Sequence, residues 1–223
     1  MLNKIKTKIT EYLGFDVDEL LNQGDFVTIF GGAVRDSIAE FQEIHDVDVL
    51  CLSQSMKSCD KFLQSQGYIL DINAYKNGFN DLYKELRVVH EPHSYIKIIE
   101  GKIHKVQLIK PYLSFQLKRF VDITHRYDTL LKNVDLTCCG VSINSNGFTE
   151  HYEHAVVHCR CQVYGVVEDA LMKTNRINDR KAKLDNRGWD DINASFLSQT
   201  KKDMLELSLK QESLNKKIKK IKK

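Results

Sequence analysis

The spacing of hydrophobic residues changes along the chain between a period of two and a period of three to four, and each period predicts one kind of element. Apolar or alternating runs predict strands at residues 26–30, 46–50, 68–72, 96–99, 103–109 and 134–141. Apolar residues three and four apart predict helices over residues 1–13, 33–41, 53–66, 200–223 and from about 122. This order predicts an α+β fold, in which a small mixed sheet with helices on one face precedes a mostly helical C-terminal region.

Residues 26–50 contain the most informative pattern. The first strand ends at Gly31-Gly32, where no Cβ blocks the approach of a phosphate to the backbone. The helix that follows begins with free N–H groups, which favour an anion. The next strand begins with Asp46-Val-Asp48, and alternation places both carboxylates on one face and the valines on the other. Two carboxylates on one face can share a hard cation such as Mg²⁺.

This order of strand, Gly-Gly turn, helix and Asp-x-Asp strand resembles the polymerase-beta-like nucleotidyltransferases. It is most similar to the head domain of the bacterial-type CCA-adding enzymes and poly(A) polymerases, with the pattern G-G-x-V-R-D followed by D-x-D. The match reads Gly31-Gly-Ala-Val-Arg-Asp36 and Asp46-Val-Asp48. The resemblance implies transfer of a nucleoside monophosphate from an NTP to a hydroxyl acceptor, first of all an RNA or tRNA 3′ end. A protein side chain or another small molecule with a hydroxyl group remains an alternative acceptor.

The resemblance also implies roles for the matched residues. Asp46 and Asp48 would be catalytic and would hold Mg²⁺ in a two-ion mechanism. The backbone of the Gly-Gly turn would cradle the β and γ phosphates. Arg35 would clamp the triphosphate, because its planar fork matches phosphate oxygens. Asp36 would orient Arg35 or favour the helix N-terminus. The alternative is that Gly31-Gly32 form an ordinary turn and that Asp46 and Asp48 are the solvated end of a strand.

The later motifs match only in part. Residues 134–141 resemble the family segment R-R-D-F-T-I-N-A, in which Asp135 and Thr137 match and Cys139 replaces the asparagine. The resemblance implies that Asp135 contributes to nucleotide binding.

A second partial motif follows. Glu168-Asp169 resembles E-D-x-x-R, which reads the incoming base in the family, but Met172 stands at the arginine position. Arg176 lies one helical turn later and can reach back. Asp169 and Arg176 are therefore predicted nucleotide-binding residues, and weak discrimination among NTPs is expected unless Arg176 reads the base.

Gln107 occupies the strand position from which many relatives take a third carboxylate. An amide oxygen carries no charge and is a weaker Mg²⁺ ligand, although Asp135 or a water could fill the place. A second hypothesis therefore stays open, in which the fold binds nucleotide or RNA without catalysis. A third hypothesis is an interaction protein that acts through its basic tail.

Charge divides the chain unevenly. Of the net charge of +3, residues 200–223 carry +6, from nine lysines against three acidic residues, which leaves −3 for the rest. The expected division is a nucleotidyltransferase head at 1–150, a helical neck-like region at 151–199 and a basic amphipathic tail helix at 200–223. The apolar seam of the tail predicts docking on its own domain, contact with RNA phosphates or an oligomer contact. It comprises Met204, Leu207, Gln211, Leu214, Ile218 and Ile221.

Cysteine use and hydropathy bear on the compartment. Six cysteines without a secretion signal predict buried thiols in a reducing cytoplasm, and no apolar run approaches the length of a membrane span. A cluster at 151–161 contains three histidines and two cysteines, but its spacing fits no common zinc pattern. We expect it to form a helix whose apolar side packs inward.

Overall fold

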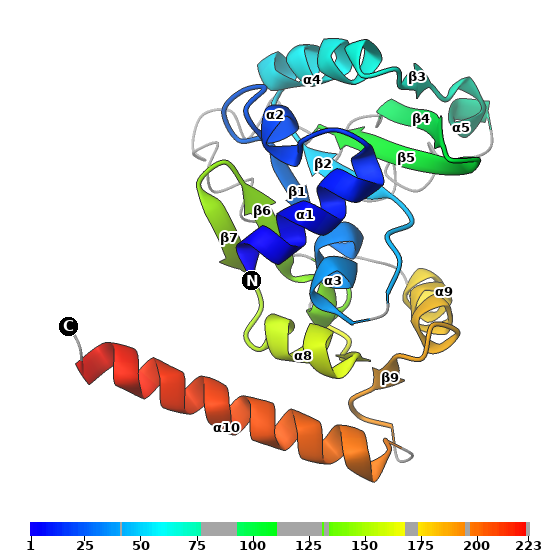
Figure 1. Ribbon diagram of the computed structural model, residues 1–223. Helices are drawn as coiled ribbons and strands as arrows, with labels where there is room; N and C mark the ends of the chain where they lie inside the picture. Colours follow the sequence, from blue (N-terminus) through cyan, green and yellow to red (C-terminus); the bar gives the residue numbers. More distant parts are fainter. Residues whose placement is uncertain are drawn as a thin grey trace, which may run out of the picture.

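The computed structural model describes residues 1–40, 42–76, 93–110, 131, 134–167, 174–194 and 197–221. Seven strands lie in these residues in one mixed sheet, with the order β3-β4-β5-β2-β1-β6-β7 (Figure 1). Their bounds are β1 (Thr28–Phe30), β2 (Val47–Leu50), β3 (Ile69–Leu70), β4 (His93–Ile99), β5 (Lys102–Ile109), β6 (Val141–Asn144) and β7 (Gly147–Glu150). The predicted α+β class and mixed sheet are confirmed.

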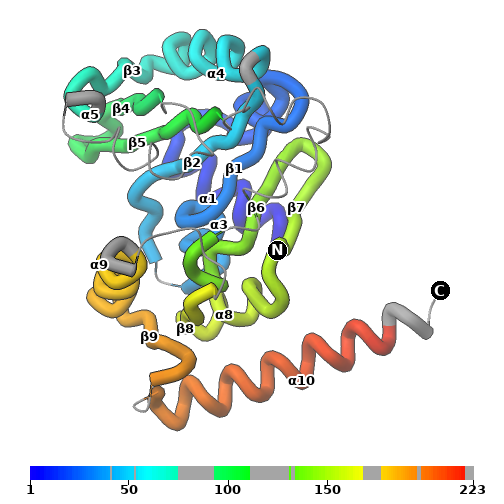
Figure 2. Tube along the Cα trace, turned by 180° about the vertical axis from the view of Figure 1, so that it is seen from behind, coloured from blue at the N-terminus to red at the C-terminus, as the bar shows by residue number. Residues whose placement is uncertain are grey.

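Among the described helices, four cover one face of this sheet. They are α1 (Leu2–Leu13), α2 (Val17–Leu21), α3 (Gly32–Ile38) and α4 (Ser53–Ser65). From behind, the strands lie in front of α1 and α3 (Figure 2). Ile5 and Ile9 of α1 belong to the same buried cluster as Val47 and Val49 of β2. The apolar side of β2 therefore faces the helices, so Asp48 projects from the opposite face, called the second face below.

The C-terminal elements pack below the sheet. They are α8 (Ala155–Cys161), β8 (Val163–Tyr164), α9 (Thr174–Asp185), β9 (Asp190–Asp191) and α10 (Gln199–Ile221). β8 and β9 pair in parallel, and α8 contacts α3, which joins this region to the helices that cover the sheet. α10 runs beneath α8 (Figure 1). Within the described part of the chain, every helix is too short or too polar to cross a membrane.

The prediction of one strand over residues 134–141 is wrong. Thr137–Cys139 form a 3₁₀ turn, η2, and the strand β6 begins only at Val141. The Thr137 N–H donates to the Gly165 carbonyl, while its Oγ1 accepts from the Gly165 N–H. The segment therefore pairs with the chain near residue 165, and the Gly140 N–H closes the turn onto the Thr137 carbonyl.

Other predicted bounds need smaller corrections. The helix predicted at 33–41 ends at Ile38, and Ala39 is already extended. The strand predicted at 68–72 stops at Leu70, because Asp71 Oδ1 accepts from two backbone N–H groups and starts the helix α5 (Ile72–Lys76). The helix predicted from about residue 122 lies outside the described residues.

The tail is a single helix that docks through a different face from its predicted seam. Leu205 and Leu209 of α10 contact the cluster of Val157, Cys161 and Val163. The seam leucines instead face solvent, and Leu207 is 66% exposed. Ion pairs of the helix with the body fix this rotation. They are Lys201–Asp190 at 2.9 Å and Glu212–His154 at 2.9 Å.

Candidate functional site

The two carboxylates of the Asp-x-Asp segment lie at the start of β2. Asp46 directly precedes the strand and Asp48 is its second residue, while Val47 and Val49 between and after them are fully buried. Asp48 Oδ1 is buried and has no hydrogen-bond partner in the described part of the molecule. An unpartnered carboxylate oxygen beside a second carboxylate fits a divalent cation, which takes oxygen ligands.

The electrostatics of Asp48 agree with this fit. Burial, followed by repulsion from Asp46, raises the pKa of Asp48 to about 8, and Arg180 only partly opposes the shift. A cation between the carboxylates would supply the missing positive charge and favour the ionised form. Among the described residues, no group of three or more His, Cys, Asp or Glu side chains is placed to hold a metal. Asp46 and Asp48 are the described residues that would hold a metal ion here.

The Gly-Gly turn lies beside this pair. Gly31 has φ 68° and ψ −125°, a backbone conformation that favours glycine. A Cβ on Gly32 would lie 3.7 Å from Arg35 Nη2 and 3.9 Å from Asp46 Oδ1, so turn, arginine and carboxylate are in contact range. The Gly31 N–H donates to the Val141 carbonyl at 3.1 Å. Because this bond occupies the Gly31 N–H, the N–H groups from Gly32 onward are the better candidates for the predicted phosphate cradle.

Arg35 is held in place rather than extended toward solvent. Its Nε and Nη2 donate to the two carboxylate oxygens of Asp36, at 2.7 and 2.9 Å, and its Nη1 contacts Cys139 Sγ at 3.3 Å. The guanidinium lies 5.3 Å from the ring centre of Trp189, and Arg35 is only 6% exposed. Arg187 adds a second cation to Asp36, at 3.0 Å. Asp36 thus orients Arg35, and both join α3 to the C-terminal region.

Arg180 of α9 is a site residue that the sequence did not indicate. Its Nε lies 3.0 Å from Asp135 Oδ2, and Asp135 is fully buried. Its Nη2 lies 3.9 Å from Cys139 Sγ. Arg176, the predicted residue, lies four residues earlier in the first turn of the same helix, and Asp169 lies outside the described residues. The spacing of four residues on one helix face was the available signal, because Arg176 and Arg180 share that face.

Cys139 stands between the two guanidinium groups. The hydrogen bond with the Cys138 thiol lowers the pKa of Cys139 to about 6; burial opposes this shift, and Arg35 and Arg180 add to it. A thiolate there would balance part of the charge of both arginines. All six cysteines are free and buried.

Gln107 on β5 is the register partner of Asp48. It occupies the position from which many of the resembled enzymes take a third carboxylate. It is 5% exposed, and Ser94 of β4 is its partner on the other side. The amide therefore stands directly beside the carboxylate pair, so this site has a neutral side chain in the third position.

Comparison with protein-family models and with curated proteins finds no match. Solved structures do resemble the fold. A tRNA-processing enzyme in an apo form has a TM-score of 0.51 and 13% identity, covering 91% of this chain and 47% of that one. The Bacillus stearothermophilus CCA-adding enzyme in complex with CTP has a TM-score of 0.40 and 15% identity, covering 84% and 42%. A tRNA-processing enzyme complex has a TM-score of 0.40 and 14% identity, covering 90% and 48%.

The first of these likenesses shows the fold. The chain shares its overall fold with this structure, whose name identifies it as a tRNA-processing enzyme. The chain spans about half the length of the structures that it matches.

Proposed function

We propose that this protein is a Mg²⁺-dependent nucleotidyltransferase that transfers a nucleoside monophosphate from an NTP to the 3′-hydroxyl of an RNA. The observation that carries the proposal is the carboxylate pair beside the Gly-Gly turn, in which Asp48 Oδ1 is buried and has no partner among the described residues. The shared fold with a tRNA-processing enzyme supports RNA as the acceptor.

In this reaction the acceptor 3′-oxygen forms a bond to the α-phosphorus of the NTP. The bond from that phosphorus to the bridging oxygen breaks, pyrophosphate leaves, and the hydroxyl proton passes to solvent. Asp46 and Asp48 would hold Mg²⁺, which when bound lowers the pKa of the hydroxyl and stabilises the leaving oxygen. The backbone from Gly32 onward would bind the triphosphate.

The C-terminal elements complete the nucleotide side of the site. The Arg180 side chain is one-third exposed, whereas Arg35 is enclosed by Asp36 and Trp189. Arg180 is therefore the better candidate to contact the NTP, and Arg35 positions the α3 turn that bears the glycines. In this arrangement residues 1–150 form the head, and residues 151–199 contribute α9 to the nucleotide site.

The test is incubation of the chain with each radiolabelled NTP, Mg²⁺ and total tRNA. Incorporation of label into RNA is expected for the wild type and is expected to disappear in Asp46→Asn and Asp48→Asn. Binding of Mn²⁺, followed by its electron paramagnetic resonance signal, should weaken in the same variants. Full incorporation by either variant would contradict the assignment.

A second candidate function is nucleotide or RNA binding without transfer. The observation that favours it is Gln107, whose neutral amide stands beside Asp48 where a third carboxylate would strengthen metal binding. Saturable NTP binding without labelled RNA, under conditions in which Mn²⁺ is bound, would select this candidate.

A further inference from the structure

Three side chains form a row on the second face of the sheet. Asp48 on β2 pairs in register with Gln107 on β5, and Gln107 pairs with Ser94 on β4. Register partners on neighbouring strands project from the same face. Because strands lie about 4.8 Å apart, the row extends roughly 10 Å from the backbone of Asp48 to that of Ser94. From Asp48, these three side chains lead toward β5 and β4.

Both ends of the row carry buried oxygen atoms without a partner. Ser94 Oγ and Asp48 Oδ1 are buried and accept or donate no hydrogen bond within the described residues. Ser94 is 1% exposed. Buried polar atoms of folded proteins are nearly always paired, and leaving one unpaired costs free energy. A ligand that enters the row and pairs with these atoms would remove that cost.

The chemistry of the row identifies the class of ligand. Apart from Asp48, its groups are a neutral amide and a neutral hydroxyl, each able to donate and to accept. Such groups suit hydroxyls rather than phosphates, for which charged donors are stronger. A ribose with a free 3′ end presents two adjacent hydroxyls of this kind.

The position of the row separates it from the triphosphate. The Gly31-Gly32 turn follows β1, which borders β2 on the side opposite to β5. The triphosphate therefore lies on the β1 side of the carboxylates, and the β5 and β4 side is left for the acceptor. A 3′-hydroxyl at Asp48 places the 2′-hydroxyl of the same sugar toward Gln107.

We propose that Gln107 and Ser94 form a subsite that binds the 2′-hydroxyl side of the acceptor's terminal ribose, so that the protein selects an RNA end over a DNA end. The inference rests on the proposed transfer to a 3′-hydroxyl and adds the residues that determine the sugar. Neither residue touches the reacting phosphorus. Both are specificity-determining residues.

The experiment uses two acceptor oligonucleotides that are identical except for a 2′-hydroxyl or a 2′-hydrogen on the last sugar. The ratio of kcat/KM for the two acceptors is measured for the wild type, Ser94→Ala and Gln107→Leu. The wild type should prefer the ribose end by at least about tenfold, the effect of about one well-placed hydrogen bond. Each variant should reduce the preference to less than about threefold, because one partner of the hydroxyl is gone.

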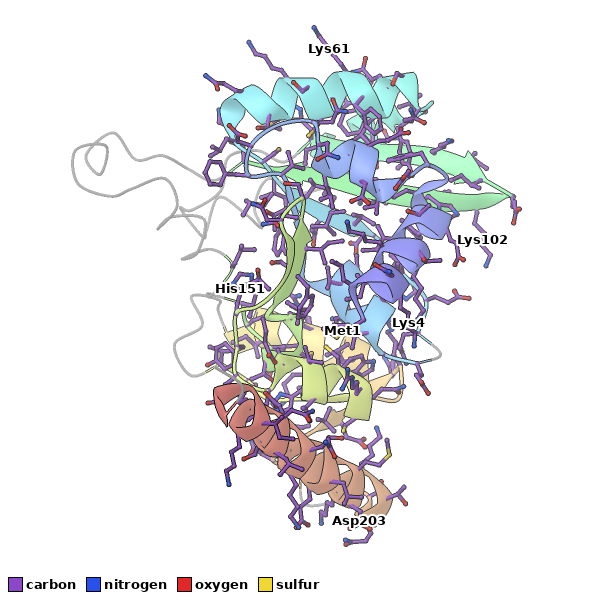
Figure 3. All side chains as sticks on the ribbon, turned by 60° about the vertical axis from the view of Figure 1, so that its left-hand side comes forward. Met1, Lys4, Lys61, Lys102, His151 and Asp203 are labelled. Carbon is purple, nitrogen blue, oxygen red and sulfur yellow. The ribbon has the colours of Figure 1, made fainter. Side chains whose placement is uncertain are left out.

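A matched control is available on the same face. Ser142 of β6 is the register partner of Phe30, which in turn pairs with Asp48, so Ser142 projects from the same face of the sheet on the β1 side of Asp48. Its Oγ lies 2.7 Å from Nε2 of His151, which Figure 3 labels beside β7. Ser142→Ala should keep the wild-type preference. Thermal unfolding of all variants checks that they are folded.

A binding measurement separates this inference from the proposed function. Fluorescence anisotropy of the same two oligonucleotides is recorded for the full chain with Ca²⁺ and without NTP. A wild-type affinity at least about tenfold higher for the ribose end, lost in Ser94→Ala, supports the subsite even if no transfer occurs. Absence of transfer with this preference would contradict only the proposed reaction. Equal affinities and equal rates for the two ends in the wild type, or a preference unchanged in both variants, would overturn the subsite.

Discussion

The two halves of the candidate site differ in how the chain builds them. The first half is one continuous strand-turn-helix-strand segment, residues 26–50, whose glycines and carboxylates are placed by their neighbours in sequence. The second half joins Cys139 of η2 to Arg180 of α9, 41 residues apart. A local pattern is thus sufficient to place a motif, whereas a residue that reaches the site from a separate helix depends on how that helix docks.

The largest expected effect tests the first half. Asp48→Asn should reduce transfer by at least about 10³-fold, or about 4 kcal/mol of transition-state stabilisation, because the metal loses a charged ligand. Single-turnover rates with a saturating NTP measure this. Asp18→Asn, which removes an acidic group far from the site in a half-exposed ion pair with Lys6, is the control and should retain activity. Retained transfer in Asp48→Asn would show that the carboxylate pair is not the reaction centre.

In the absence of metal, the same variant should also change how the thermal stability depends on pH. The pKa of Asp48 is raised to about 8 in the folded protein, above an unfolded value of about 4. Protonated Asp48 makes its full contribution to the free energy of unfolding below about pH 4, and this contribution is lost as the pH rises through 8. In EDTA, Asp48→Asn should therefore have a higher Tm than the wild type at pH 8, by at least about 2 °C, and an equal Tm near pH 4. Equal values at both pH values would contradict the shifted pKa.

The second half of the site is tested by Arg180→Met. Removal of the guanidinium leaves the fully buried Asp135 carboxylate without its cation, and a buried charge without a partner typically costs about 3–5 kcal/mol. We expect a loss of about 2–3 kcal/mol, because one-third of the Arg180 side chain is exposed and solvent screens part of the interaction. Urea unfolding measures the change.

The double variant Arg180→Met with Asp135→Asn provides the control for this ion pair. It should recover most of the lost stability, because the amide needs no counter-charge. Recovery would assign the cost to the charge on Asp135. A single variant as stable as the wild type would instead show that Arg180 is not what balances Asp135.

These results show why some features were predictable from the sequence. The face of β2 that carries Asp46 and Asp48 follows from the alternation of a strand, and the register that sets Gln107 beside Asp48 lies within one sheet. The strand predicted at 134–141 failed because Thr137 bonds to Gly165, a contact that no local pattern indicates. Arg180 lies four residues after the predicted Arg176, but its partner Asp135 is distant in sequence, so this contact was missed.

The tail helix gives a further case, in which the element was predicted correctly and its docked face was not. Leu205 is 9% exposed against α8, whereas Leu207, two residues later, is 66% exposed. Leu205→Ala should destabilise the protein by about 2 kcal/mol, at the low end for a buried leucine. Leu207→Ala should change the stability by less than about 0.5 kcal/mol. Chemical unfolding of both variants measures the difference, and equal effects would show that the helix docks through its seam.

The smallest expected effect concerns Cys139, which lies between the arginines of the two halves. Its pKa is lowered to about 6 in the folded protein, below an unfolded value of about 8.5. The resulting stabilisation is complete above about pH 8.5 and is lost as the pH falls through 6. Cys139→Ser should therefore lower the Tm more at pH 8.5 than at pH 5.5, by roughly 2 °C, or about 1 kcal/mol. Cys159→Ser is the control, since burial raises the pKa of that thiol and it stays protonated.

Ultraviolet absorbance of the thiolate should titrate near pH 6 in the wild type and in the control, and should disappear in Cys139→Ser. A thiolate absorbance that persists in Cys139→Ser would assign the ionised sulfur to another cysteine and leave Arg35 and Arg180 without this shared partner.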